Sequence, residues 1–420
     1  MTPTNSTLIR ALGDAVGASH VLVEDDVKAS YEVDWMRRWQ GRSTCVVRPA
    51  DTGEVARVVS ICAKHRTPIV PQGGNTGLVG GSVPGDGEPV VLSLRRMDAI
   101  SDVDAMSGQV TAGAGATLES VQDAVAGSGW EVGIDLASRA SATIGGMVAT
   151  NAGGIRVLRD GMMRRQVVGL EFVRASGEVV TSMRGLVKDN TGYDLAGLLC
   201  GSEGTLGVVT RVTLQLVPQR PHRIVALIPV PDLREAVGTM TAVRPRLPSL
   251  EAAEFVSRAT LQLVRSHTGL PMPSAAADAA ILILEAAGTH DPTDELFAAV
   301  GEIPGVVVGI DAASREGLWR YREAATESIA ANGVPHKIDV TLPLGRMADF
   351  AEALHIAVEE VSPGAGLYLF GHIADGGVHV NVLADTPSAD SEIDHVVMAM
   401  TAEYGGSISA EHGIGRAKAS

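Results

Sequence analysis

The hydrophobic residues of the first part of the chain alternate between helical and extended spacing. Apolar side chains recur on one helical face at residues 6–18 and again at 55–62, which predicts two amphipathic helices. Asp51, with Glu54 three residues later, is typical of the capping box that begins the second helix. Apolar runs of strand length lie between and after these helices, at residues 46–49, 69–70 and 90–92. This order predicts a small α/β unit.

The alternation continues with a second group of elements. Residues 109–115 form the next expected strand, and residues 117–127 form the next expected helix. Pro218 and Pro221 then interrupt the pattern and mark a domain boundary. The expected first domain and its two subdomains cover residues 1–218, about 1–105 and 106–218.

Beyond the boundary, strands and helices follow the order of a ferredoxin-like antiparallel sheet, expected over residues 219–420. Expected strands lie at residues 223–229, 281–285 and 306–310, and expected helices at 232–241, 291–300, 350–361 and 392–404. One long helix is expected at residues 314–331, ending before Gly333. Residues 367–370 and 378–382 flank a turn, so we expect a hairpin there.

Three stretches of the first domain are rich in glycine. Residues 71–82 follow an expected strand and hold five glycines, and residues 143–154 and 201–210 are the other two stretches. Backbone N–H groups in such loops approach a phosphate closely. Neither the P-loop nor the G-x-G-x-x-G spacing is present at 71–82. We favour a cradle for a long ligand such as a dinucleotide, and three separate tight turns are the alternative.

Composition narrows the functional classes. The 420 residues are 45% hydrophobic, which is enough for two or three domains, and the net charge of −15 argues against a nucleic-acid surface. Cys45, Cys62 and Cys200 form no metal pattern and fit a reducing compartment. No apolar run predicts a transmembrane span or a signal peptide. We expect a cytoplasmic protein, and peripheral membrane contact stays open.

Candidate reactive side chains lie in the second half. His372 and His379 flank the turn of the expected hairpin, and Glu411 and His412 are adjacent further on. Two imidazoles and a carboxylate suit zinc, manganese or iron(II). Taken singly, each histidine is more often an ordinary hairpin or core residue, and the spacing of seven between the first two is not a standard metal motif.

Two cations are candidates for holding a carboxylate. Arg322 and Thr326 are four residues apart and should share a face of the long helix. Lys337 and Asp339 alternate on the following strand and point to the same side. An arginine fork suits a carboxylate, although a single cation is most often a solvated surface residue.

Together these strings resemble one protein family. PQGGNTGLVGG, IGGMVATNAGG and GSEGTLGVVT are similar to the FAD-binding segments of FAD-dependent D-2-hydroxyacid dehydrogenases of the vanillyl-alcohol-oxidase type, and the resemblance covers about residues 31–418. It implies an α+β fold, with a two-subdomain PCMH-type FAD-binding domain followed by a ferredoxin-like α+β substrate (cap) domain. Many relatives with covalently attached FAD carry histidine where this chain has Asn75, so non-covalent FAD is expected.

The resemblance also implies roles for individual residues. The expected metal ligands are His372, His379 and Glu411, and zinc is the expected divalent metal. The expected general base is His412. Substrate contacts fall on Arg322, Thr326, Lys337 and Asn381. The residues expected to contact FAD lie in the glycine-rich stretches: Pro71, Gly73, Gly74, Asn75, Thr76, Gly77, Gly80, Gly81, Ser82, Ile144, Gly145, Gly146, Asn151, Gly153, Gly154, Glu203 and Val209.

The chain departs from the family pattern at two places. The family hairpin reads G-H-x-G-D-G-N-x-H, whereas Ala374 replaces a glycine and Gly377 replaces the asparagine. The chain stops at Ser420, where the family continues with a terminal helix and a D-P…N-P-G segment, so the second domain is expected to be shorter at its C-terminus.

The implied activity is FAD-dependent, metal-assisted oxidation of a small D-2-hydroxy acid of the 2-hydroxyglutarate or lactate class to the 2-oxo acid. The expected electron acceptor is electron-transfer flavoprotein or a quinone-linked acceptor, and a homodimer is one possible assembly. Three alternatives stay open: a flavin-dependent oxidase, a glycolate-type dehydrogenase, and a flavin-binding subunit with little activity of its own.

Overall fold

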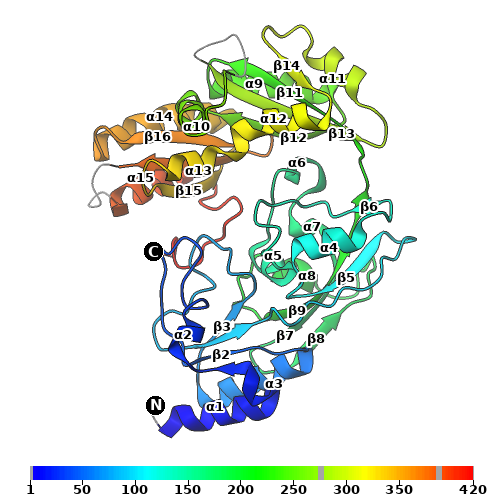
Figure 1. Cartoon of the computed structure of the whole chain (residues 1–420), viewed down its shortest axis with the longest axis vertical. Coiled ribbons are helices and arrows are strands. Elements are labelled where there is room, and N and C mark those ends of the chain that lie inside the picture. The colour runs from blue at the N-terminus through cyan, green and yellow to red at the C-terminus, as the bar shows by residue number, and fades with distance from the viewer. Residues whose placement is uncertain (1–2, 273–278, 385–389, 420) are drawn as a thin grey trace. The chain divides into compact units, whose positions relative to one another are not determined.

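The computed structural model describes residues 3–272, 279–384 and 390–419 and divides the chain into two units (Figure 1). The first unit contains Met1–Gly154, Asp160–Pro218 and Glu411–Ser420. The second unit contains Ile155–Arg159 and Gln219–Ala410. The expected division at residue 218 therefore differs at two short segments, which belong to the opposite unit.

The first subdomain of the first unit is a small, mostly parallel sheet with the order β1-β2-β4-β3. Its strands are β1 (Val21–Leu22), β2 (Cys45–Val47), β4 (Val90–Ser93) and β3 (Ile69–Gln72), and only β1 is antiparallel to its neighbour. Its helices are α1 (Pro3–Val16), η1 (Ala18–His20), α2 (Asp25–Lys28) and α3 (Thr52–His65). The expected N-cap is confirmed, because the Asp51 side chain accepts a hydrogen bond from the Glu54 N–H at 2.8 Å. The Glu54 side chain accepts from the N–H of Ala50 at 2.7 Å and not from that of Asp51, so the expected capping box is only partly formed.

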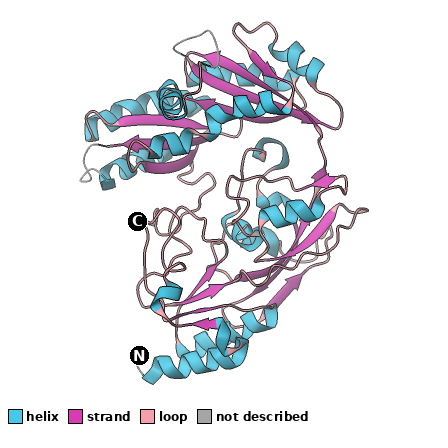
Figure 2. Cartoon of the chain, viewed as in Figure 1, coloured by secondary structure: helices cyan, strands magenta, loops and turns pink. Residues whose placement is uncertain are grey.

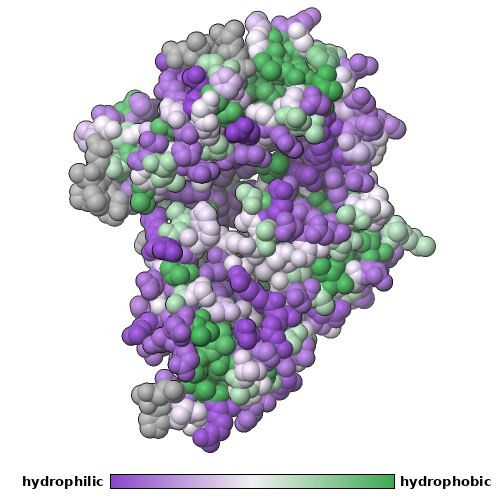
Figure 3. Space-filling model, viewed as in Figure 1, coloured by the Kyte–Doolittle hydropathy of each residue, from purple (hydrophilic) through white to green (hydrophobic). Residues whose placement is uncertain are grey.

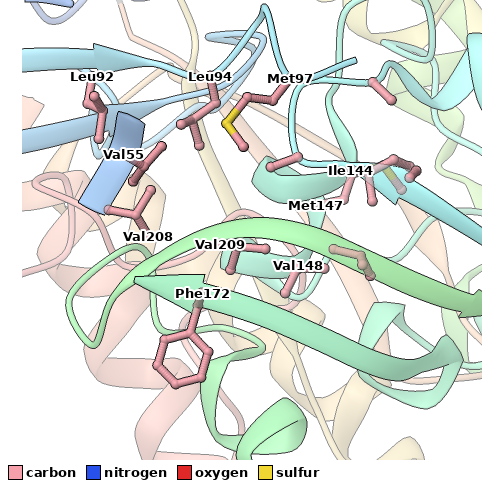
Figure 4. Close-up of a cluster of buried hydrophobic side chains, with 14 of the residues drawn as sticks. Val55, Leu92, Leu94, Met97, Ile144, Met147, Val148, Phe172, Val208 and Val209 are labelled. Carbon is pink, nitrogen blue, oxygen red and sulfur yellow. The ribbon is translucent and has the colours of Figure 1, made fainter. Parts of the chain in front are cut away.

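The second subdomain contains an antiparallel sheet with the order β5-β9-β7-β8. Its strands are β5 (Gln109–Gly113), β9 (Val208–Gln215), β7 (Val167–Val173) and β8 (Val179–Ser182), and β6 (Trp130–Glu131) pairs separately with β10 (Val217–Pro218). Its helices are α4 (Leu118–Val125), α5 (Ile144–Thr150), α7 (Met163–Gln166) and α8 (Leu195–Leu199). Met147 and Val148 of α5 lie with Val209 of β9 in the hydrophobic core (Figure 4).

The second unit is built on one antiparallel sheet of seven strands, with the order β14-β11-β13-β12-β16-β17-β15. The strands are β14 (Val307–Gly309), β11 (His222–Val230), β13 (Ala280–Gly288), β12 (Leu250–Val256), β16 (Gly366–His372), β17 (Gly377–Leu383) and β15 (His336–Thr341). The expected α+β class and the hairpin of β16 and β17 are confirmed.

Helices cover both faces of this sheet (Figure 2). One core includes residues of α9 (Leu233–Val243), α11 (Thr293–Val300), α14 (Met347–Val361) and α15 (Asp390–Glu403). The short η2 (Arg244–Arg246) follows α9 in the chain, and η3 (Leu344–Arg346) precedes α14. The core on the opposite face includes residues of α10 (Arg258–Thr268), α12 (Ala312–Glu323) and α13 (Ala325–Ala330). The candidate site residues lie on this second face.

Two features differ from the sequence expectations. The long helix is interrupted at Ala324, where ψ is −5°, so Arg322 lies in the last turn of α12 and Thr326 lies in α13. The single long helix expected at residues 314–331 was therefore wrong, and helical spacing alone no longer supports a shared face for these two side chains. Residues 155–159 belong to the second unit, where Arg156 pairs with the buried carboxylate of Glu251 at 3.2 Å. This segment contains α6 (Val157–Asp160) except for Asp160, which belongs to the first unit.

Candidate active site

The glycine loop after β3 lies against the second glycine-rich stretch. A Cβ built on Gly73 would lie 2.1 Å from Oγ1 of Thr143, and one on Gly74 would lie 1.8 Å from the carbonyl oxygen of Ser141. Only glycine fits at these positions without a shift, because a side chain would overlap its neighbour. Two stretches that are distant in sequence therefore form one surface of the first unit.

The loop offers backbone N–H groups to a ligand. Among the described residues, the N–H groups of Asn75, Thr76 and Gly77 donate no hydrogen bond to another backbone group. Asn75 has a left-handed φ of 58°, and a Cβ on Gly77 would meet nothing within 4 Å. Successive N–H groups in such a turn form a concavity that suits phosphate oxygens. The loop thus fits the pyrophosphate of a dinucleotide.

The polar side chains of the loop hold its shape. Oγ of Ser82 donates to Oδ1 of Asn75 at 2.8 Å, and Nδ2 of Asn75 donates to the carbonyl oxygen of Val33 at 2.8 Å. Nε2 of Gln72 donates to the carbonyl oxygen of Ser82 at 2.8 Å. Direct contacts from the Asn75 and Ser82 side chains to FAD stay predictions.

Some backbone N–H groups of the second glycine-rich stretch form hydrogen bonds within the first unit. The N–H groups of Ile144 and Gly145 donate to the carbonyl oxygens of Ala116 and Ala114, each at 2.9 Å. A Cβ on Gly145 would lie 2.6 Å from Cβ of Ala114, so glycine here permits close packing of α5. Val209 is buried in the core. These observations give a structural reason for three residues that were expected to contact FAD.

Glu203 holds the C-terminal segment (residues 411–418), which belongs to the first unit. Its Oε1 accepts the N–H of Ile414 and its Oε2 accepts the N–H of Gly415, each at 2.8 Å. The carbonyl oxygen of Val79, in the glycine loop, accepts the next N–H of the segment at 2.8 Å. The segment that carries the expected base is therefore bound to the glycine loop and to Glu203, a role that the sequence did not predict.

Glu411 is held at the start of this segment. The N–H of Gly154 donates to Oε1 of Glu411 at 2.7 Å. Gly154 has φ 135°, and a Cβ there would lie 2.1 Å from the carbonyl oxygen of Asp135, so glycine is required. One oxygen of the expected metal ligand is thus fixed by the second glycine-rich stretch, and the half-buried His412 follows it.

The remaining candidates lie on one face of the seven-stranded sheet. The pairing of β15 with β17 places Asp339 opposite His379 and Lys337 opposite Asn381. Residues paired in this way share a face of an antiparallel sheet. The rings of His372 and His379 have centroids 5.4 Å apart, which confirms that the hairpin brings the two histidines together.

A buried glutamate that we did not single out from the sequence joins two candidates. Glu254 of β12 is 1% exposed and lies opposite His372 in the sheet. One of its oxygens accepts a hydrogen bond from Nδ1 of His372, and Oε2 accepts one from Nε of Arg322 at 2.6 Å. Burial raises the pKa of the Glu254 carboxyl, but the interactions with His372 and Arg322 outweigh it and lower the pKa to about 2. The sequence signal was a charged residue inside the apolar run AAEFV, because a buried carboxylate needs partners.

His379 has a similar neighbour. Its Nδ1 lies 3.3 Å from Oδ1 of Asp339, which is 1% exposed. His372 and His379 thus both present Nδ1 to a buried carboxylate, so Nε2 is the nitrogen that would face a metal. The hydrogen bond to Glu254 fixes the His372 ring, and Asp339 places a negative charge beside the His379 ring, so the two histidines fit a divalent metal. Glu411, the third expected ligand, belongs to the first unit, so the full ligand set stays a prediction.

The two expected substrate cations are electrostatic neighbours. Burial lowers the pKa of the Lys337 ammonium, the charge of Arg322 lowers it further, and Asp339 opposes the shift. Cζ of Arg322 lies 4.5 Å from the centroid of the Phe370 ring, which supports the guanidinium from one side. Asn381 is buried on the same face of the sheet, and Thr326 is half-buried in α13.

Gly377, which replaces the asparagine of the family pattern, lies beside His372. A Cβ built on Gly377 would lie 3.5 Å from Cβ of His372 and 3.1 Å from Oδ1 of Asp375. The asparagine of the family pattern would thus extend next to a candidate metal ligand, and glycine removes that side chain. Ala374 is buried in the turn.

Comparison with known proteins agrees with both halves of this description. The family model of the FAD binding domain matches residues 43–182, and the model of the C-terminal domain of FAD linked oxidases matches residues 219–420. The D-2-hydroxyglutarate dehydrogenase of Xanthomonas citri pv. viticola is 36% identical to the chain over 427 residues, which cover 98% of this chain and 89% of that protein. The chain belongs to the FAD-linked oxidase family.

Other similar proteins support the same family. The mitochondrial D-2-hydroxyglutarate dehydrogenase of Bos taurus is 37% identical to this FAD-linked oxidase over 415 residues, covering 96% of the chain and 75% of that protein. Among solved structures, an alkyldihydroxyacetonephosphate synthase is similar in fold, with a TM-score of 0.77 at 16% identity, covering 96% of this chain and 80% of that chain. The FAD-linked oxidase is therefore a flavoprotein oxidoreductase, and the predicted family and fold class are confirmed.

The surface of this FAD-linked oxidase is mixed. On the face drawn in Figure 3, hydrophilic residues predominate and hydrophobic residues gather in separate patches. Within the part of the chain that the structure describes, no helix combines the length and the apolar character needed to span a membrane.

Proposed function

We propose that this FAD-linked oxidase oxidises a D-2-hydroxy acid of the 2-hydroxyglutarate or lactate class to the 2-oxo acid. The observation that carries the proposal is the sheet face of the second unit, where two imidazoles backed by carboxylates share a surface with Arg322 and Lys337. The similar proteins named D-2-hydroxyglutarate dehydrogenase support the substrate class.

The two cations suit the carboxylate of such a substrate. Arg322 uses Nε for Glu254, and among the described residues neither of its Nη groups donates a hydrogen bond. The two Nη groups are the forked pair that grips a carboxylate. Lys337 adds a second positive charge that is only partly exposed. Thr326 and Asn381 are proposed as further contacts.

The reaction removes the C2 hydrogen with its electron pair and the proton of the C2 hydroxyl, and the C2–O bond becomes a carbonyl. FAD, held non-covalently by the glycine-rich stretches, supplies the two-electron acceptor. His412 takes the hydroxyl proton, since imidazole gains and loses a proton near neutral pH. His372, His379 and Glu411 would hold a divalent metal, zinc in our proposal, which supplies Lewis-acid stabilisation of the hydroxyl oxygen.

Electrons would leave the flavin to electron-transfer flavoprotein or to a quinone-linked acceptor. This part of the proposal rests on family resemblance. The homodimer and the cytoplasmic location also stay proposals.

The decisive experiment is a visible spectrum of the purified flavoprotein under anaerobic conditions. Bleaching of the flavin band by D-2-hydroxyglutarate or by D-lactate supports the proposal and names the better substrate. A flavin band that neither acid bleaches, in protein loaded with Zn²⁺, overturns it. Rapid peroxide formation in air would instead identify an oxidase.

The general base is tested by His412→Ala. Because the imidazole would accept the hydroxyl proton, this variant should lose flavin reduction by about 10²-fold or more while it keeps bound FAD. Native reduction rates in the variant would remove His412 from the mechanism.

A further inference from the structure

Glu254 occupies a position between two groups of different expected function. Its side chain is 1% exposed, and it bonds His372 through one oxygen and Arg322 through the other. A carboxylate removed from water in this way is costly unless both oxygens are paired. A hydrophobic residue at this position would avoid the cost of burying a charge, so the geometry indicates a role beyond stability.

The two bonds constrain both partners. The bond to Nδ1 of His372 fixes the tautomer and the ring plane, so that Nε2 is the coordinating nitrogen. The bond to Nε of Arg322, together with the Phe370 ring beside the guanidinium, fixes the plane in which the Nη groups lie. Both constraints originate in one carboxylate on β12, which is central in its sheet.

We propose that Glu254 is a positioning residue that orients the metal ligand His372 and the substrate-binding Arg322 together. This inference rests on the proposed function of these two residues. It implies that the Glu254 side chain affects both the affinity for the substrate and the affinity for the metal. Asp339 offers a comparison, because its Oδ1 lies 3.3 Å from Nδ1 of His379, and within the described part of the chain it forms no hydrogen bond or ion pair with Arg322.

Glu254→Gln separates the two constraints. An amide presents one oxygen and one NH₂ group, so it can accept from His372 or from Arg322, and its NH₂ group then faces the other donor. We expect Zn²⁺ affinity to fall by about 10-fold to 100-fold, as is typical when a carboxylate behind a metal-bound histidine is changed. We also expect the KM for the hydroxy acid to rise several-fold at saturating Zn²⁺. Glu254→Asp keeps the charge and should recover part of both losses.

The experiment measures Zn²⁺ affinity by chelator competition and the KM and kcat of flavin reduction in native protein, Glu254→Gln, Glu254→Asp and Asp339→Asn. The expected pattern is a joint change of Zn²⁺ affinity and KM in Glu254→Gln. In Asp339→Asn we expect a change of metal affinity with a smaller change of KM, because Asp339 interacts electrostatically with Lys337 and not with Arg322. Native Zn²⁺ affinity in Glu254→Gln overturns the proposal, as does an equal KM change in Asp339→Asn.

Failure of the proposed function has a different signature in the same series. Native protein that binds no Zn²⁺ and whose flavin no hydroxy acid reduces contradicts the function itself. Native protein that does both, with an unchanged Glu254→Gln, contradicts the role of Glu254 alone. If Glu254→Gln does not fold, judged by bound FAD, Glu254→Asp decides: native values for both affinities would overturn the proposal.

Discussion

The backbone N–H of Gly154 donates a hydrogen bond of 2.7 Å to Oε1 of Glu411. Gly154 is the last residue of the first segment of the FAD-binding unit, and Glu411 is the first residue of its last segment. The bond therefore joins two points at which the chain passes from one unit to the other.

Two substitutions of Glu411 should distinguish its hydrogen bond with Gly154 from its proposed role in metal binding. Glu411→Gln keeps an oxygen for the Gly154 N–H but loses the negative charge, whereas Glu411→Ala loses both. We expect both variants to bind Zn²⁺ more weakly than native protein. Only Glu411→Ala should show faster amide exchange around residue 154 by hydrogen–deuterium exchange. Native Zn²⁺ affinity in Glu411→Gln would exclude this carboxylate as a ligand.

Glu203→Ala should release the C-terminal segment. It removes two hydrogen bonds to a charged group, each worth about 1.5–3 kcal/mol, so amide exchange in residues 412–418 should rise about tenfold or more. FAD should stay bound. Loss of FAD with unchanged exchange would instead make Glu203 a cofactor contact. Glu178→Ala is the control, because that exposed glutamate pairs with Arg174 at the surface of the same unit.

The glycine loop offers a matched pair of substitutions. Gly74→Ala places a Cβ against the carbonyl oxygen of Ser141, so we expect a loss of about 1–3 kcal/mol in the free energy of unfolding. Gly77→Ala meets no neighbour and should leave the stability of the FAD-free protein within about 0.5 kcal/mol. If the loop binds the pyrophosphate closely, Gly77→Ala should still weaken FAD binding. Chemical denaturation and FAD titration measure the two quantities, and equal stability of both variants would refute the predicted packing.

Lys337 should make stability depend on pH. Its pKa in the folded protein lies below the ordinary value of 10.5, so the unfolded chain holds more protons between the two values and stability rises with pH there. At neutral pH the native protein carries the full cost of the buried charge. Lys337→Met should therefore be more stable than native protein at pH 7 but bind the hydroxy acid more weakly. Denaturation from pH 7 to 11 tests this, and a stability difference that does not shrink as pH rises contradicts it.

Sequence patterns predicted most of the fold because the relevant signals are local. The helix N-cap at Asp51, the hairpin around residues 373–377 and the alternation on β15 are each set by neighbouring residues. The break at Ala324 could not be predicted, since no glycine or proline marks it and ψ flattens within an otherwise helical run.

The candidate site was predicted only where its residues are close in sequence. His372 and His379 meet because one hairpin joins them. Glu254 reaches the site through the order of strands in the sheet, and Glu203 reaches residues 414 and 415 from another part of the chain. Such pairings depend on strand order and loop packing, which a single sequence does not reveal.

The discontinuous first unit has a consequence for biosynthesis. Domains generally fold as units, starting from the N-terminus while the ribosome is still adding residues. Here the partners of Glu203 and Gly154 are translated only after the whole of Gln219–Ala410. The glycine loops therefore emerge well before the segment that binds beside them, and this part of the first unit stays incomplete until the last residues of the chain are translated.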